Sequence, residues 1–189
     1  MPAQALKLAV ELRRLRRRWD VYIAEPPPIE LSPPLDYACV LEGLASTTDL
    51  DLDRVQLAPF ALTWSGKVPL LIHHDFDRLA GEIKELSYTK DGSVRCKCHV
   101  KGEGARYGAF SVAFEIIKYE LHNTETPHFF ARILKAELKE LSLVTRPVNT
   151  QALVKDRYPL FNPGSFYDLA LAKVATLKQL IQTKEGKAA

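Results

Sequence analysis

The chain has 189 residues, of which 47% are hydrophobic and 26% charged, a composition typical of a globular protein with one domain of ordinary size. Its apolar runs fall well short of the roughly 20 residues of a membrane span, and no apolar secretion segment follows the basic N-terminal stretch. Three cysteines, Cys39, Cys96 and Cys98, cannot all form disulfides with one another and lack zinc-finger spacing. We therefore expect a reducing compartment, no membrane association and no metal.

The net charge of +3 is concentrated in residues 1–20, which hold six basic and two acidic side chains. Leu8, Leu12, Leu15 and Trp19 recur there at spacings of three and four, which predicts a helix with one apolar face. This basic helix could dock on a partner, on nucleic acid or on an anionic surface. It could equally pack on its own domain and expose its arginines to solvent.

Prolines recur between residues 26 and 34, which favours an extended connector after the helix. We therefore divide the chain into a basic helix with its linker (1–35), a core (36–155) and a C-terminal amphipathic helix with a tail (156–189). The last helix is predicted from a start signal at 162–165 and from the apolar stripe of Phe166, Ala170, Val174, Leu177 and Ile181.

The core is dominated by strand patterns. Segments 37–46 and 67–74 are the first two candidates, and the second has the continuous apolar run of a buried strand. Segments 79–89 and 93–101 flank Asp91-Gly92, which predicts a hairpin. In its second arm Val94, Cys96, Cys98 and Val100 should share the inner face.

The remainder of the core is less regular. Segment 102–121 is mixed, and the spacing of Gly102, Gly104 and Gly108 fits neither a dinucleotide-binding fingerprint nor a P-loop. Segment 129–145 predicts a strand on which Leu138, Glu140 and Ser142 share one face.

Three residues in this core supply a base, a hydroxyl nucleophile and a carboxylate: His74, Ser111 and Glu140. This is the minimum set of a serine hydrolase. The G-x-S-x-G mark of a nucleophile elbow is absent, so the set would belong to a different fold. Taken alone the set is only a candidate, because a histidine in an apolar strand commonly has a structural role.

The segments around these residues resemble the prohead maturation proteases of tailed bacteriophages, which are relatives of herpesvirus assemblin. The resemblance covers residues 37–154 and includes LEGLAS, VPLLIHHD followed by LAGEI, and the Asp91-Gly92 hairpin. FSVAF is similar to the family's Leu-Ser-Ile-Gly-Phe type of segment, and LKELSLVTRPVN resembles its Glu-x-Ser-Leu-Val-x-x-Pro-x-Asn strand. The chain departs from the family pattern at Phe110 and at Ala113, where glycine is frequent.

The resemblance implies a mainly β (α+β) fold with a compact, assemblin-like β-barrel core flanked by helices. It implies Ser111 as nucleophile, His74 as general base and Glu140 as the third member of the triad. The protein would then be a serine endopeptidase inside the procapsid, in the cytoplasm of a bacterial host. It would cleave the scaffold protein, the N-terminal segment of the major capsid protein, or both, and also itself, without a cofactor, and it could self-associate.

Several alternatives stay open for the site. His73 could be the base, because a shift of one residue on a strand turns a side chain to the other face. Ser142 could be the nucleophile, although a supporting hydroxyl is the favoured role. A metal site at His73, His74 and Asp75 is disfavoured, because neighbours on a strand point opposite ways and no His-Glu-x-x-His helix is present.

Two other functions are compatible with the sequence. A non-enzymatic capsid-assembly or scaffold module could retain the protease-like core, and the departures at Phe110 and Ala113 leave this open. A nucleic-acid-binding protein would rest on the N-terminal helix alone, with no recognised reading motif, so we expect no nucleic-acid partner.

Overall fold

The structure is a computed structural model, and it describes residues 3–19, 21, 28–29 and 38–160. The predicted C-terminal helix lies outside these residues, as does the predicted linker apart from residues 21, 28 and 29. One helix precedes a set of strands and a short 3₁₀ helix. In chain order the elements are α1 (Ala3–Trp19), β1 (Ala38–Ser46), β2 (Val55–Leu57), β3 (Leu62–Thr63), β4 (Leu70–Ile72), β5 (Asp75–Tyr88), β6 (Val94–Lys101), η1 (Gly102–Arg106), β7 (Ala109–His122), β8 (Phe130–Val144) and β9 (Val154–Pro159).

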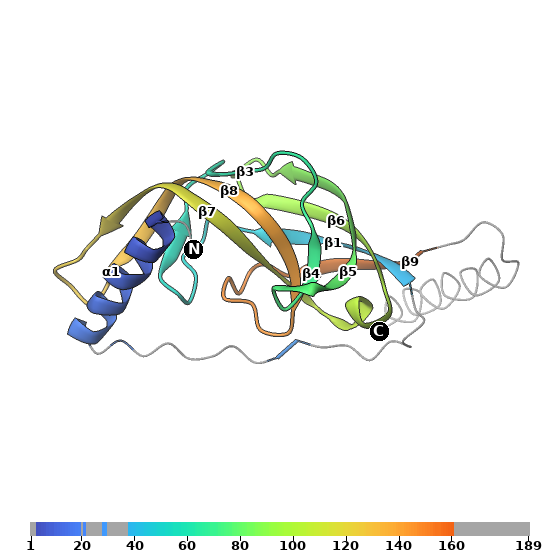
Figure 1. Cartoon of the computed structure of the whole chain (residues 1–189), viewed down its shortest axis with the longest axis horizontal. Helices are drawn as coiled ribbons and strands as arrows, with labels where there is room; N and C mark the ends of the chain where they lie inside the picture. The colour runs from blue at the N-terminus through green and yellow to red at the C-terminus, as the bar shows by residue number, and fades with distance from the viewer. Residues whose placement is uncertain (1–2, 20, 22–27, 30–37, 161–189) are drawn as a thin grey trace, which may run out of the picture.

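All nine strands belong to one mixed sheet, in the order β2-β8-β4-β5-β6-β1-β9, with β3 and β7 also paired to β8 (Figure 1). The mainly β prediction is confirmed, whereas the predicted closed barrel is wrong for the described residues. Closure needs a continuous, staggered ladder around the whole sheet. Here β7 meets the chain before β9 only at the isolated bridge between Ala109 and Leu153.

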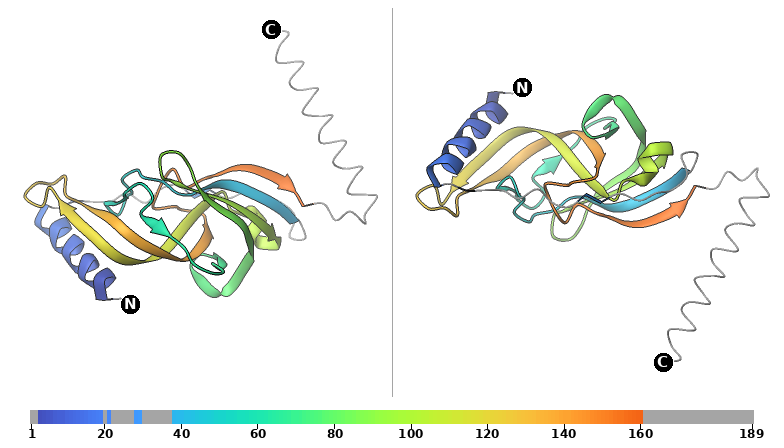
Figure 2. Two further views of the ribbon diagram at one scale, coloured as in Figure 1. Left: turned by 90° about the horizontal axis from the view of Figure 1, so that it is seen from above. Right: turned by 90° about the horizontal axis from the view of Figure 1, so that it is seen from below.

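The long antiparallel pair β7–β8 forms the main framework of the sheet. Three shorter strands, β2, β3 and β4, lie parallel to β8. The sequence left 102–121 as a mixed segment, but most of it forms the 14-residue strand β7. The alternation of apolar and polar residues along β7 is weak, because most of its residues are half-buried on both faces of the sheet. Two further views show β7 and β8 running as one curved ribbon from α1 towards the other strands (Figure 2).

The predicted hairpin is confirmed as β5–β6, with Gly92 at a φ of 82° in its turn. Val94, Cys96, Cys98 and Val100 are all buried on the inner face, as predicted. Burial raises the pKa of the Cys39 and Cys96 thiols, which keeps them protonated and unreactive. The three cysteines are therefore core residues with free thiols.

The predicted N-terminal helix is confirmed as α1, and it packs on its own domain. Leu8, Leu12 and Leu15 are buried against the β7–β8 end of the sheet. The Tyr119 hydroxyl donates to Glu11 at 2.7 Å, and the Trp19 indole N–H donates to the Thr124 carbonyl at 3.3 Å. The helix is too short and too polar to cross a membrane, and no other helix of the described chain qualifies.

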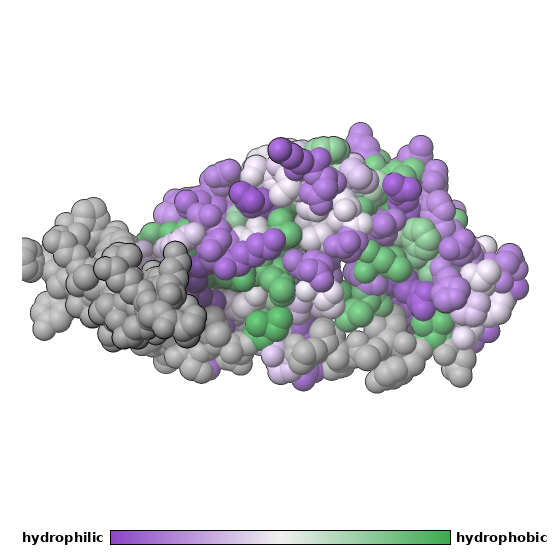
Figure 3. Space-filling model, turned by 180° about the vertical axis from the view of Figure 1, so that it is seen from behind, coloured by the Kyte–Doolittle hydropathy of each residue, from purple (hydrophilic) through white to green (hydrophobic). Residues whose placement is uncertain are grey.

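The surface seen from behind is mostly polar. Hydrophilic side chains predominate on this face, and apolar residues form small separate groups among them (Figure 3). Single exposed apolar residues are normal on a globular protein. The side chains that could carry chemistry are gathered instead near the C-terminal end of β8.

Candidate active site

His74 lies in a tight turn between β4 and β5, not within a strand as predicted. β4 ends at Ile72, and both His73 and His74 have positive φ angles, 53° and 62°. Such left-handed conformations cost of order 1–3 kcal/mol for residues other than glycine, so the surrounding structure must hold them. The His73 N–H donates to the Leu143 carbonyl at 3.0 Å, which anchors the turn to β8.

Ser111 and Glu140 come from the neighbouring strands β7 and β8. In the antiparallel register Ser111 lies opposite Ser142 and Ala113 lies opposite Glu140. Side chains of directly paired residues share one face of a sheet, so all four point to the same side. The register shifts immediately beyond Glu140, where Lys139 is the extra residue of a bulge. Bulges of this kind re-aim side chains next to functional sites.

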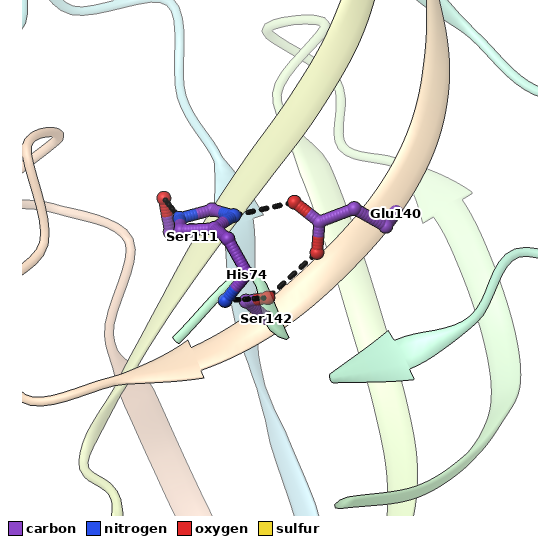
Figure 4. Close-up of polar contacts among 4 residues, drawn as sticks. All are labelled: His74, Ser111, Glu140 and Ser142. Atoms are coloured by element: carbon purple, nitrogen blue, oxygen red, sulfur yellow. Dashed lines mark hydrogen bonds and ion pairs between the residues drawn. The ribbon is translucent and has the colours of Figure 1, made fainter. Parts of the chain in front are cut away.

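The turn carries the His74 ring over β8 to reach both of the other predicted site residues (Figure 4). Its Nδ1 lies 2.5 Å from Glu140 Oε1, and its Nε2 lies 3.0 Å from Ser111 Oγ. The side chain of Glu140 is 2% exposed, whereas that of His74 is 43% exposed. The structure therefore brings the three residues named from the sequence into one hydrogen-bonded chain that runs from the interior to the surface.

Ser142 is a fourth member of this hydrogen-bonded group and contacts both Glu140 and His74. Its hydroxyl donates to Glu140 Oε2 at 2.6 Å and accepts from the backbone N–H of His74 at 3.0 Å. Both oxygens of the buried Glu140 carboxylate thus have partners, which a buried carboxylate requires. Ser142 is fully buried and contacts no imidazole ring nitrogen, so it is placed to support the site and not to attack a substrate.

These contacts fix the tautomer of His74. An ionised carboxylate can only accept, so Nδ1 carries the proton that Glu140 receives, and Nε2 is left as the acceptor for the Ser111 hydroxyl. A ring held in this way can take a proton from Ser111 Oγ and later return it. The geometry is that of an activated serine nucleophile.

The other candidates raised by the sequence lie elsewhere. The His73 ring packs edge-on against Tyr107, with 5.0 Å between ring centroids, and makes no contact with Ser111. Tyr107 donates in turn to Glu103 at 2.8 Å. Hydrogen bonds from Arg78 and Tyr107 lower the pKa of Glu103.

Within the described residues, no group of three or more histidine, cysteine, aspartate or glutamate side chains is arranged to hold a metal ion.

A cavity of about 300 Å³ opens beside Ser111, and Ser111 and His74 form part of its wall. Phe110, Val112 and Phe114 of β7 line it as well. A third group of lining residues was not predicted from the sequence: Asp49, Asp51 and Asp53 of the loop between β1 and β2. Their alternate spacing in the run TDLDLDR was the available signal, but nothing in the sequence placed that loop next to β7.

The carboxyl group of Asp51 has a perturbed pKa. Burial raises its pKa from 3.8 to about 7, and the neighbouring charge of Asp53 adds to the rise. The Val55 N–H, which donates to Asp51 Oδ1 at 2.7 Å, acts in the opposite direction. A carboxyl group with a strongly raised pKa in a cavity is a common mark of a functional site.

No protein-family model matches the chain, and neither the curated proteins nor the solved structures contain a match.

Proposed function

We propose that this protein is a serine endopeptidase with a Ser-His-Glu triad formed by Ser111, His74 and Glu140. The observation that carries the proposal is the hydrogen-bonded chain from Glu140 through His74 to Ser111, at the wall of a cavity able to receive a substrate side chain. Nucleophile, base and orienting carboxylate within hydrogen-bond reach are the geometric signature of this chemistry.

In the proposed reaction Ser111 Oγ attacks the carbonyl carbon of the scissile peptide bond while His74 Nε2 takes the hydroxyl proton. The buried Glu140 carboxylate stabilises the imidazolium that forms. Collapse of the tetrahedral intermediate breaks the C–N bond, and His74 gives its proton to the leaving amine. Water, deprotonated by His74, then cleaves the acyl-serine ester and regenerates the Ser111 hydroxyl.

The biological setting follows from the sequence resemblance to prohead maturation proteases. We propose that the protease is enclosed in a procapsid within the cytoplasm of a bacterial host. Its partners are the scaffold protein and the major capsid protein, whose N-terminal segment it cleaves, and it also cleaves itself. The proposal uses the site residues that the resemblance implies. It does not include a closed barrel, because the described strands form an open sheet.

The test is co-expression of the chain with the capsid and scaffold proteins encoded beside it, followed by intact-mass measurement. We expect defined cleavage products with the wild type and with Ser65→Ala, and none with Ser111→Ala. Ser65 is a suitable control because its hydroxyl donates to the side chain of Glu137 and to none of the three triad residues. Uncleaved proteins in all three cases, with shell assembly still dependent on the chain, would favour the scaffold-module alternative. Cleavage that persists in Ser111→Ala would contradict the assigned nucleophile.

A further inference from the structure

The cavity beside Ser111 has two chemically different zones. Near the nucleophile its wall is apolar, with Phe110, Val112 and Phe114 from β7. The loop between β1 and β2 contributes the second zone, which consists of the carboxyl groups of Asp49, Asp51 and Asp53. We call this cavity the acidic pocket. It is identified as a substrate site by the nucleophile and the base in its own wall, independently of its charge.

Only one of the three carboxylates has a cationic partner. Arg16 of α1 donates to Asp53 Oδ1 at 3.0 Å and to the Asp53 carbonyl. Asp49 accepts from the Thr47 hydroxyl, and Asp51 accepts from the Val55 N–H. Among the described residues, no lysine or arginine forms an ion pair with Asp49 or Asp51. Within the part of the chain that the structure describes, the pocket therefore holds two carboxyl groups without an ion-pair partner, and Arg16 affects Asp51 only through its nearby charge.

We propose that the acidic pocket binds a lysine or arginine side chain of the substrate close to the scissile bond. The inference rests on the proposed function, because it assigns the substrate class of the same site. These side chains combine an apolar stem with a cationic head, and the pocket combines an apolar wall with carboxylates in the same way. Its volume of about 300 Å³ is at the lower end for ligand sites, which suits one side chain.

The state of Asp51 agrees with this assignment. Burial disfavours its ionised form, and an incoming cation would favour that form and offset the cost. Beside a neutral substrate side chain Asp51 would stay protonated and would gain no such charge interaction. Recognition would thus depend on the charge of the substrate, and Asp51 would act as a specificity-determining residue.

The experiment first tests the nucleophile without reference to specificity. A fluorophosphonate probe is added to the full-length protein, and labelling of Ser111 is read by intact mass, with Ser111→Ala as control. Labelling of the wild type alone supports an activated serine. Absence of labelling together with absence of cleavage would overturn the proposed function itself.

Specificity is then measured with a library of synthetic peptides that presents all side chains around each possible cleavage point. We expect lysine and arginine to be enriched at one fixed position. In Asp51→Asn the ratio of kcat/KM for basic over neutral peptides should fall at least about tenfold, because one partner of a buried charge pair is lost. Asp156→Asn, an exposed carboxylate on β9, should leave the ratio unchanged. Labelled Ser111 with cleavage that shows no preference for basic residues would overturn this inference and spare the proposed function.

A binding measurement makes the inference testable without turnover. p-Aminobenzamidine, an aromatic cation, should bind full-length Ser111→Ala and bind at least about tenfold more weakly when Asp51→Asn is added. Equal binding to both variants, or none to either, would contradict recognition of a cation by this pocket.

Discussion

At the scale of single residues, Ser142 holds the candidate site together from a buried position. Ser142 is bonded both to Glu140 and to the backbone of His74, so it fixes the carboxylate and the strained turn at the same time. It does not line the acidic pocket. Under the proposed function Ser142 is a positioning residue, and its loss should act on the rate of reaction more than on binding.

We expect Ser142→Ala to lower kcat about 10- to 100-fold with little change in KM, because the substitution removes the hydrogen-bond partner of Glu140 Oε2 and that of the His74 N–H. The same loss should reduce the free energy of unfolding by about 1–3 kcal/mol. Steady-state kinetics on a cleaved peptide and urea unfolding measure the two effects. A rise in KM with an unchanged kcat would contradict the positioning role.

Asp51 gives the stability of the protein a defined dependence on pH. Its pKa rises from 3.8 to about 7 on folding. Between these two pH values the folded state therefore holds a proton on Asp51 that the unfolded state has lost. The stability contributed by that proton is complete below about pH 4 and is lost as pH rises through about 7. The shift corresponds to at most about 4 kcal/mol. Asp51→Asn should flatten the decline between pH 4 and 7, as urea unfolding at several pH values would show. An unchanged slope would refute this role of Asp51.

At the scale of elements, α1 contributes to the domain through one buried stripe. Leu12 is 6% exposed on the face that packs on β7–β8, whereas Val10 on the opposite face is 59% exposed. The helix also meets the acidic pocket, because Arg16 bonds Asp53. The helix is therefore a structural element of the folded core, whatever further partner its basic face contacts.

Leu12→Ala should lower the free energy of unfolding by about 2–4 kcal/mol, because it leaves a cavity under the helix. Val10→Ala removes a similar apolar group from an exposed position and should change stability by less than about 0.5 kcal/mol. Thermal and urea unfolding of both variants check this. Equal effects from the two substitutions would show that the helix does not pack through this stripe.

At the scale of the whole molecule, the site is assembled from segments that are far apart in the chain. His74 and Glu140 are separated by 66 positions, and His74 and Ser111 by 37. β8 brings them together, because it pairs with β4 on one side and with β7 on the other. The acidic pocket likewise joins the loop after β1 to the start of β7.

Local patterns in the sequence determined much of this protein. The spacing of Leu8, Leu12 and Leu15 identified α1 and its buried face, and the alternation from Val94 to Val100 with Asp91-Gly92 identified the β5–β6 hairpin. The residue types and flanking motifs singled out His74, Ser111 and Glu140, and the period of two placed Ser142 on the face of Glu140. Each of these inferences depends only on neighbours within a few residues, where helix and strand geometry fix which side chains share a face.

Only the tertiary structure decided the remaining features. It replaced the expected barrel by an open sheet, showed β7 as one long strand, and put His74 in a left-handed turn that reaches over β8. It also brought Asp49, Asp51 and Asp53 to the nucleophile. These features depend on which strands pair across long stretches of chain and in which register, and hydrophobic periodicity carries no information about the partner of a strand.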